Sequence, residues 1–193
     1  MLILIPGLLL FIGIHSLRLI APSQRESMIG RLGAGTWKGL YSVVSLIALA
    51  MIIHGYSLTR LNPVVVFTPD VWTRHMALLF TWLAFILLAA GFIPHNHLKA
   101  RLGHPMYAGI KIWAFAHLLA NGRLGDLLLF GTFMVWAIAG FSFRRRQDRR
   151  LQIIAPAGNM QGTLITLVAG SIAWGIFALW LHVWMIGVYP LPF

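Results

Sequence analysis

Two histidines, His104 and His117, bracket a nearly uncharged apolar segment that also contains Tyr107 and Trp113. Ionisable groups are costly inside a bilayer, so a histidine in such a segment indicates a functional site. Imidazole can ligate haem iron, zinc or copper, and it carries protons near neutral pH. On a helix, Trp113 shares a face with His117, and Tyr107 lies one turn beyond His104. Both histidines and both aromatic residues are therefore candidates for binding a cofactor.

His15 is a third candidate, because it shares a helical face with Arg18 in an otherwise apolar segment. The remaining histidines are His54, His75, His95, His97 and His182. Those at the predicted membrane boundaries suit a structural role, since an amphipathic ring is comfortable there. His95 and His97 are two residues apart and point to different faces of a helix. They are therefore a poor zinc pair.

His104 and His117 cannot bind one metal ion together. They are thirteen residues apart on one predicted helix, which places them roughly 140° apart around its axis and ~20 Å along it. The same rise places His15 and His117 ~15 Å apart along the membrane normal. Pairs at a common depth are His15 with His104, or His117 with His54 or His182. These pairs compete with His15 and His117 as ligands of a single iron.

The elements that must position these residues are membrane-spanning helices. Of the 193 residues, 59% are hydrophobic and only 10% are charged, whereas a soluble domain carries about a quarter charged residues. The apolar residues fall in runs long enough to cross a bilayer. We predict an all-α integral membrane bundle, a single domain over residues 1–193. Its six predicted spans are 2–20, 39–58, 75–94, 105–120, 124–143 and 163–187.

The basic residues predict the orientation of these spans. Fifteen Lys and Arg face four acids, which gives a net charge of +11. They gather in the first, third and fifth connections, and the positive-inside rule then places both termini outside the cytoplasm. The fifth connection, 144–162, begins with an arginine-rich run that suits anionic lipid headgroups. No basic domain remains outside the spans, so nucleic acid is not expected as a partner.

Cysteine is absent from the chain. This excludes disulfides, thiolate ligation of haem, covalent haem attachment through thiols and a cysteine nucleophile. A metal or cofactor must therefore be held by histidine, methionine, tyrosine, carboxylate or backbone groups.

The chain contains several specific motifs: Gly13-x-His15-Ser16 with Arg18, then Gly30-Arg31 and Tyr41-Ser42, and above all the string from Gly103 to Gly122. These motifs resemble the NnrU family of bacterial membrane proteins, named from denitrifying bacteria. The resemblance extends over nearly the whole chain. It implies a multi-pass protein of the bacterial inner (plasma) membrane with a role in denitrification, in support of nitrite and nitric oxide reduction.

That family in turn resembles the zeta-carotene isomerases, membrane enzymes that bind haem b through two histidines. The resemblance implies that His15 and His117 are the metal ligands. From their positions in the predicted helices, His104, Trp113, Tyr107 and Arg18 are predicted as further cofactor-binding residues. It implies an isomerase-like redox step on a lipophilic small molecule. The isomerase's cysteine near the second ligand corresponds to Ala114 here, so the thiol part of that mechanism cannot operate.

Two alternatives remain open. The stretch from His104 to Gly109 resembles membrane methyltransferases of the isoprenylcysteine carboxyl type, which use S-adenosylmethionine. That resemblance implies roles for His104, Tyr107 and Asp148, although Gly103 replaces the arginine that begins the methyltransferase pattern. The other alternative is a structural or sensory membrane protein without catalysis. The sequence assigns no catalytic residue and no oligomeric state.

Overall fold

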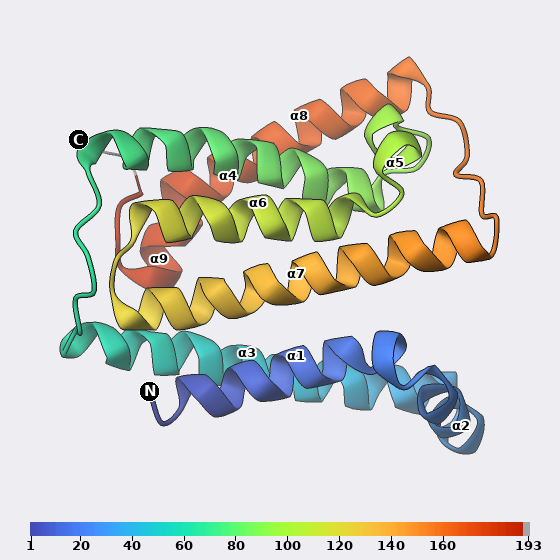
Figure 1. Cartoon of the computed structure of the whole chain (residues 1–193), viewed down its shortest axis with the longest axis horizontal. Helices are drawn as coiled ribbons and strands as arrows, with labels where there is room; N and C mark the ends of the chain where they lie inside the picture. The colour runs from blue at the N-terminus through green and yellow to red at the C-terminus, as the bar shows by residue number, and fades with distance from the viewer. Residues whose placement is uncertain (191–193) are drawn as a thin grey trace. The chain divides into compact units, whose positions relative to one another are not determined.

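The computed structural model describes residues 1–190, and these residues form helices without any extended strand (Figure 1). The predicted all-α fold is confirmed. The chain divides into two compact units, Met1–Val64 and the part from Val65 onward. The elements are α1 (Leu4–Ile20), α2 (Pro22–Leu32), α3 (Ala34–Leu61), α4 (Val71–Phe92), α5 (His97–Leu102), α6 (Pro105–Ala120), α7 (Leu124–Arg150), α8 (Met160–Ile176), the π-helical turn η1 (Phe177–Leu181) and α9 (His182–Ile186).

Each predicted span falls on a helix, and four helical stretches are long and apolar enough to cross a membrane. These four are α3, α4, α7 and the continuous stretch Met160–Ile186. Helices α1 and α2 are long and apolar enough to cross a membrane only when they are taken together, and the chain bends by 98° at their junction. Helix α6 has 16 residues. The chain is therefore a multi-pass membrane protein, and a count of six spans stays a prediction.

In the first unit, α1 and α3 form an antiparallel pair. The contacts run in opposite directions along the two helices, from Leu4 beside Gly55 to His15 beside Tyr41. A Cβ atom added at Gly55 would lie 2.5 Å from the backbone nitrogen of Leu4. Only glycine permits this close approach, which holds the start of α1 against the second half of α3.

In the second unit, α6 lies between α4 and α7, and α8 packs on α4 (Figure 1). Phe80 of α4 meets Phe115 of α6 with ring centroids 5.5 Å apart. The indole of Trp82 donates a hydrogen bond of 2.9 Å to the Ser171 hydroxyl of α8. Successive long helices are antiparallel, as short connections between packed helices require. The two ends of α6 are thus each surrounded by several elements of one unit.

The corner between α4 and α5 is held by the buried side chain of Asn96. Its amide donates hydrogen bonds to the backbone oxygens of Ala90 and Ile93, at 3.0 and 2.6 Å, and its oxygen accepts from the Lys99 N–H at 2.7 Å. The neighbouring His95 has a φ of 54°, and its carbonyl accepts the Asn159 N–H at 2.7 Å. These bonds fix the corner against the start of α8.

Candidate functional site

The first end of α6 contains an ion pair between His104 and Asp148. His104 is the residue before the first turn of α6, where Pro105 begins the helix. Its Nε2 lies 2.7 Å from a carboxylate oxygen of Asp148 on α7, and each side chain is 18% exposed. The carboxylate accepts, so Nε2 carries the proton in this bond. The structure thus joins two residues that the methyltransferase resemblance implicates.

Tyr107 lies one turn into α6 and packs against α7. Its ring is 5.2 Å from that of Trp136, measured between centroids. A Cβ atom at Gly140 would lie 2.3 Å from the Tyr107 ring. The glycine therefore provides the space in which this ring packs between the two helices.

His117, near the other end of α6, has a different environment. Its Nδ1 lies 2.9 Å from the Trp113 carbonyl oxygen of the same helix. A carbonyl can only accept, so Nδ1 carries the proton and Nε2 keeps its lone pair in the neutral ring. The ring stacks on Phe130 with centroids 4.3 Å apart, and Trp113 lies at 5.0 Å. Nε2 is the nitrogen that a metal would use.

His15, in the first unit, repeats this local arrangement. Its Nδ1 lies 2.8 Å from the Phe11 carbonyl oxygen one turn earlier. The ring stacks on Phe11 at 4.1 Å, and Tyr41 of α3 lies at 5.3 Å. Arg18 is exposed. Because His15 and His117 belong to different units, their separation stays a prediction.

His182 and Asp126 accompany His117 in the second unit. Both lie within electrostatic range of its imidazole. The Nδ1 of His182 lies 2.7 Å from the Val188 carbonyl oxygen, which fixes the same tautomer. His117 with His182 is therefore the one competing ligand pair that lies within a single unit.

Asp126 was not singled out from the sequence. It is 3% exposed, and it accepts the backbone N–H of Arg123 at 3.1 Å, as a residue of a capping box does. An acid three residues after a helix start is the sequence signal for this arrangement. Its nearness to His117 follows only from the packing of α6 against α7.

The described residues offer no group of three or more His, Cys, Asp or Glu side chains that could hold a metal ion. Protein zinc sites use three or four such ligands. Haem iron needs only one or two axial side chains, because the porphyrin supplies the other ligands. His97 bonds through Nδ1 to the Thr163 hydroxyl at 2.8 Å, and His54 and His75 are exposed.

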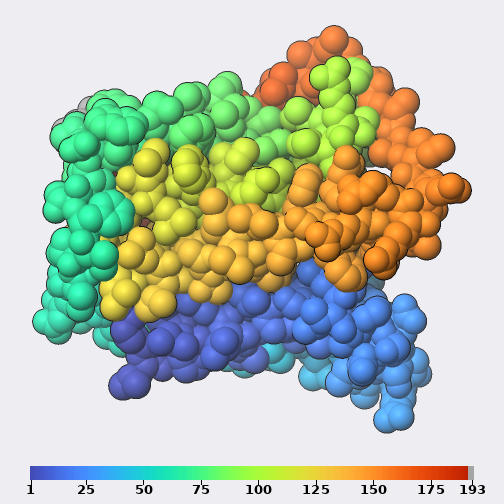
Figure 2. Space-filling view, viewed as in Figure 1, coloured from blue at the N-terminus to red at the C-terminus, as the bar shows by residue number. Residues whose placement is uncertain are grey.

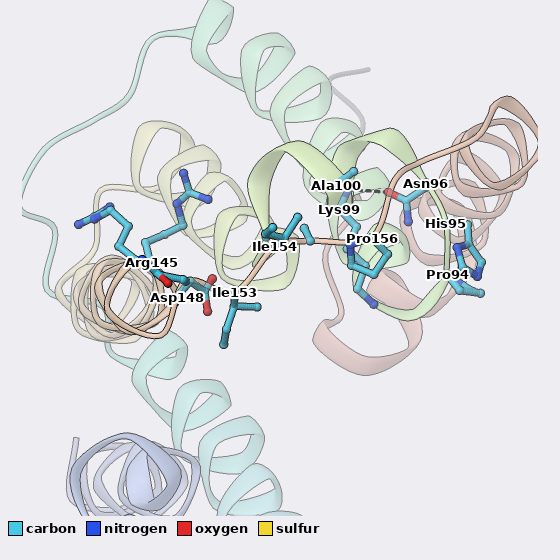
Figure 3. A pocket seen from close by; sticks show the side chains of 14 residues that line it. Pro94, His95, Asn96, Lys99, Ala100, Arg145, Asp148, Ile153, Ile154 and Pro156 are labelled. Carbon is cyan, nitrogen blue, oxygen red and sulfur yellow. Dashed lines mark hydrogen bonds between the residues drawn. The ribbon is translucent and has the colours of Figure 1, made fainter.

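Close to the ion pair, a pocket of about 810 Å³ opens between the α4–α5 corner, the end of α7 and the segment 152–156 (Figure 3). In that view Arg145 and Asp148 lie on one side, His95 and Asn96 lie on the other, and Ile154 lies between them. The basic residues in its lining are His95, Lys99, Arg145 and Arg149. The arginine-rich run was predicted to lie near lipid headgroups, whereas the pocket was not predicted from the sequence.

The family model described as NnrU protein matches residues 3–190. The chain belongs to the NnrU family. This match extends through both units and covers His15, His104 and His117 alike. Searches of curated proteins and of solved structures gave no match.

Proposed function

We propose that this NnrU family protein binds haem b in the membrane through His117 and His15. The observation that carries the proposal is that each of the two side chains makes the same kind of hydrogen bond within its own helix. In each, Nδ1 donates to the carbonyl oxygen of the residue one turn earlier, at 2.9 Å for His117 and 2.8 Å for His15. Metal-ligating histidines in general donate their second nitrogen to such an acceptor, which fixes the tautomer and raises the basicity of the ligand nitrogen.

The surroundings of both rings also suit a haem ligand. His117 stacks on Phe130, and His15 stacks on Phe11. Flat aromatic surfaces beside an axial ligand limit its rotation and exclude water, which are two ways in which a protein tunes haem iron. When bound, haem b would supply one-electron redox chemistry within the membrane.

The biological role that we propose follows from the family. It is support of nitrite and nitric oxide reduction, or an isomerase-like redox step on a lipophilic small molecule, in the bacterial inner membrane. Ala114 stands where the isomerases have a cysteine, so any such step must proceed without a thiol. We propose six spans with both termini outside the cytoplasm, in agreement with the basic connections.

The topology can be tested directly because the chain contains no cysteine. Ser23→Cys, in the first connection, and Thr68→Cys, in the second, each introduce one thiol. In intact spheroplasts, a membrane-impermeant maleimide is expected to label Thr68→Cys and not Ser23→Cys. The opposite labelling would overturn the orientation.

The haem proposal is tested by the absorption spectrum of the protein purified in mild detergent, oxidised and reduced, with a pyridine haemochrome assay. We expect a stoichiometric b-type spectrum. His117→Ala and His15→Ala should each lose it, whereas the exposed control His75→Ala should keep it. Full haem content in both ligand variants, or a colourless protein that does not take up added haemin, overturns the proposal. Loss in His182→Ala with retention in His15→Ala would reassign the second ligand.

A methyltransferase is the second candidate function, and the ion pair between His104 and Asp148 favours it. Two residues 44 positions apart are brought together beside a pocket that also includes Asp148. Isothermal titration with S-adenosylmethionine distinguishes the candidates. Saturable binding that Asp148→Asn abolishes, in a protein without haem, would favour methyl transfer.

A further inference from the structure

The pocket at the end of α7 has more cationic than anionic side chains in its lining. Lys99, Arg145 and Arg149 all line it. Its one acidic residue is Asp148, which accepts a hydrogen bond from His104 at 2.7 Å. Among residues 1–190, Asp148 forms an ion pair with His104 and with no Lys or Arg. The ammonium of Lys99 donates to the Gly91 carbonyl oxygen at 3.0 Å. The positive charge in this pocket therefore remains for a ligand.

Side-chain hydrogen bonds hold two walls of the pocket in place. Asn96 is 1% exposed, and its three hydrogen bonds tie the end of α4 to the first turn of α5 (Figure 3). The opposite wall belongs to α7. There the ion pair with His104 holds the side chain of Asp148, which lies between Arg145 and Arg149 in the sequence. A pocket with fixed walls orders few groups on binding, which favours affinity.

The rim of the pocket is strongly apolar. Ile153 is 57% exposed and Ile154 is 90% exposed, and both line the pocket. Figure 2 shows the end of α7 and the segment after it as a projecting orange edge of the second unit. Exposed isoleucines that directly follow an arginine-rich helix end are typical of the membrane interface, where apolar chains enter the lipid and arginines meet headgroups.

We propose that this pocket is a specific binding site for an anionic phospholipid, with its phosphate between Lys99, Arg145 and Arg149 and its acyl chains beside Ile153 and Ile154. A guanidinium presents a planar fork of donors that matches two phosphate oxygens. Basic pockets between membrane helices are known to take lipid headgroups. The cations match the phosphate, and the apolar rim matches the acyl chains, so free phosphate would use only part of the site. This site is distinct from the proposed haem ligands.

Neighbouring arginines provide a matched test. Arg145 and Arg149 line the pocket, whereas Arg146 and Arg150 are on the same helix end outside its lining. The double variants Arg145→Gln/Arg149→Gln and Arg146→Gln/Arg150→Gln therefore change the net charge equally. Delocalised attraction to headgroups would weaken in both to the same extent, and a defined site would weaken only in the first.

Native mass spectrometry in detergent measures the binding directly. The protein is titrated with phosphatidylglycerol, with phosphatidylcholine, and with phosphatidylglycerol in the presence of sodium phosphate. We expect one saturable phosphatidylglycerol, retained at least about tenfold more tightly than phosphatidylcholine, since each nearby basic residue contributes several-fold. The first double variant should lose this preference, and the second should keep it.

Three results would overturn the proposal. Equal retention of the two lipids would remove the headgroup preference. Equal loss in both double variants would show general surface attraction. Displacement of the lipid by millimolar phosphate would indicate a site for free phosphate. The haem content of the first double variant, measured in the same preparation, should equal that of the unaltered protein, so this test fails or succeeds independently of the haem proposal.

Discussion

The two ends of α6 hold histidines that use opposite ring nitrogens. At the first end, His104 engages Asp148 through Nε2 at 2.7 Å. Near the second end, His117 engages a backbone carbonyl through Nδ1 at 2.9 Å. The first ring lies beside a basic pocket, whereas the second lies among Trp113 and Phe130. One helix therefore presents a polar end and an aromatic end.

This difference concerns which ring nitrogen each histidine has left for a ligand, a property that the sequence alone does not show. A histidine bound through Nε2 to a carboxylate has its more accessible nitrogen occupied, and it fits the role of connecting two helices. A histidine bound through Nδ1 to its own helix has Nε2 directed away from that bond, as metal ligands do. In His117 the nitrogen left for a ligand is thus Nε2, whereas in His104 it is Nδ1.

The largest expected effect comes from changing the ligand at His117. His117→Met should retain some haem and raise its midpoint potential by about 0.1 V or more, since axial ligands cover a range of about 0.8 V. The same substitution at His104 should leave the potential unchanged. Redox titration followed at the haem bands measures both. Equal shifts at the two positions would contradict the distinction between the ends of α6.

The second effect concerns the close contact at the polar end. In Gly140→Ala the new Cβ meets the Tyr107 ring at 2.3 Å, so we expect α6 and α7 to separate locally at a cost of about 2 kcal/mol. Thermal unfolding in detergent reports this loss. Gly131→Ala is the control on the same helix, because nothing lies within 4 Å of its Cβ position; it should be neutral or stabilising through helix propensity.

A smaller effect is expected from the ion pair itself. His104→Ala, Asp148→Ala and the double variant form a cycle whose coupling energy should be about 1 kcal/mol, since both groups are partly exposed at 18%. Denaturant unfolding of the four proteins gives this value. A coupling near zero would mean that the bond does not hold α6 to α7.

The smallest effect is expected at the aromatic end. Phe130→Leu removes the ring that stacks on His117, and aromatic contacts of this kind contribute about 0.5–1.5 kcal/mol. Haem affinity should fall about two- to tenfold, without loss of the b-type spectrum. Titration of the apoprotein with haemin measures the change. A complete loss of haem would assign Phe130 a larger part than that of a neighbouring ring.

The helices were predictable because long apolar runs leave few alternatives in a membrane. The predicted span 105–120 coincides with α6. The predicted span 124–143, in contrast, stops seven residues short of the end of α7, which continues to Arg150. Hydropathy ends at the arginines, whereas their high helix propensity continues the helix. The two additional turns bring Asp148 beside His104, and for this reason the ion pair and the pocket could not be predicted from apolar runs.

The candidate site was predictable only in its residue types. His15 and His117 were named from motifs, but the hydrogen bonds that define their tautomers depend on rotamers that the sequence does not specify. The electrostatic interactions of His182 and Asp126 with His117 depend on the tertiary arrangement of the helices that carry them. Such contacts join segments far apart in the chain, and one sequence carries no record of them.

The π-helical turn Phe177–Leu181 gives the last helix a built-in change of phase. A π-type turn contains one residue more than an α-helical turn, so it behaves as a one-residue insertion. Because the extra residue is taken up within the turn, deleting one residue there would restore α-helical geometry and leave the direction of His182 unchanged. If the same five residues formed a regular α-helix instead, His182 would be rotated by about 100° around the axis. The π-helical geometry of 177–181 thus sets the direction in which His182 faces.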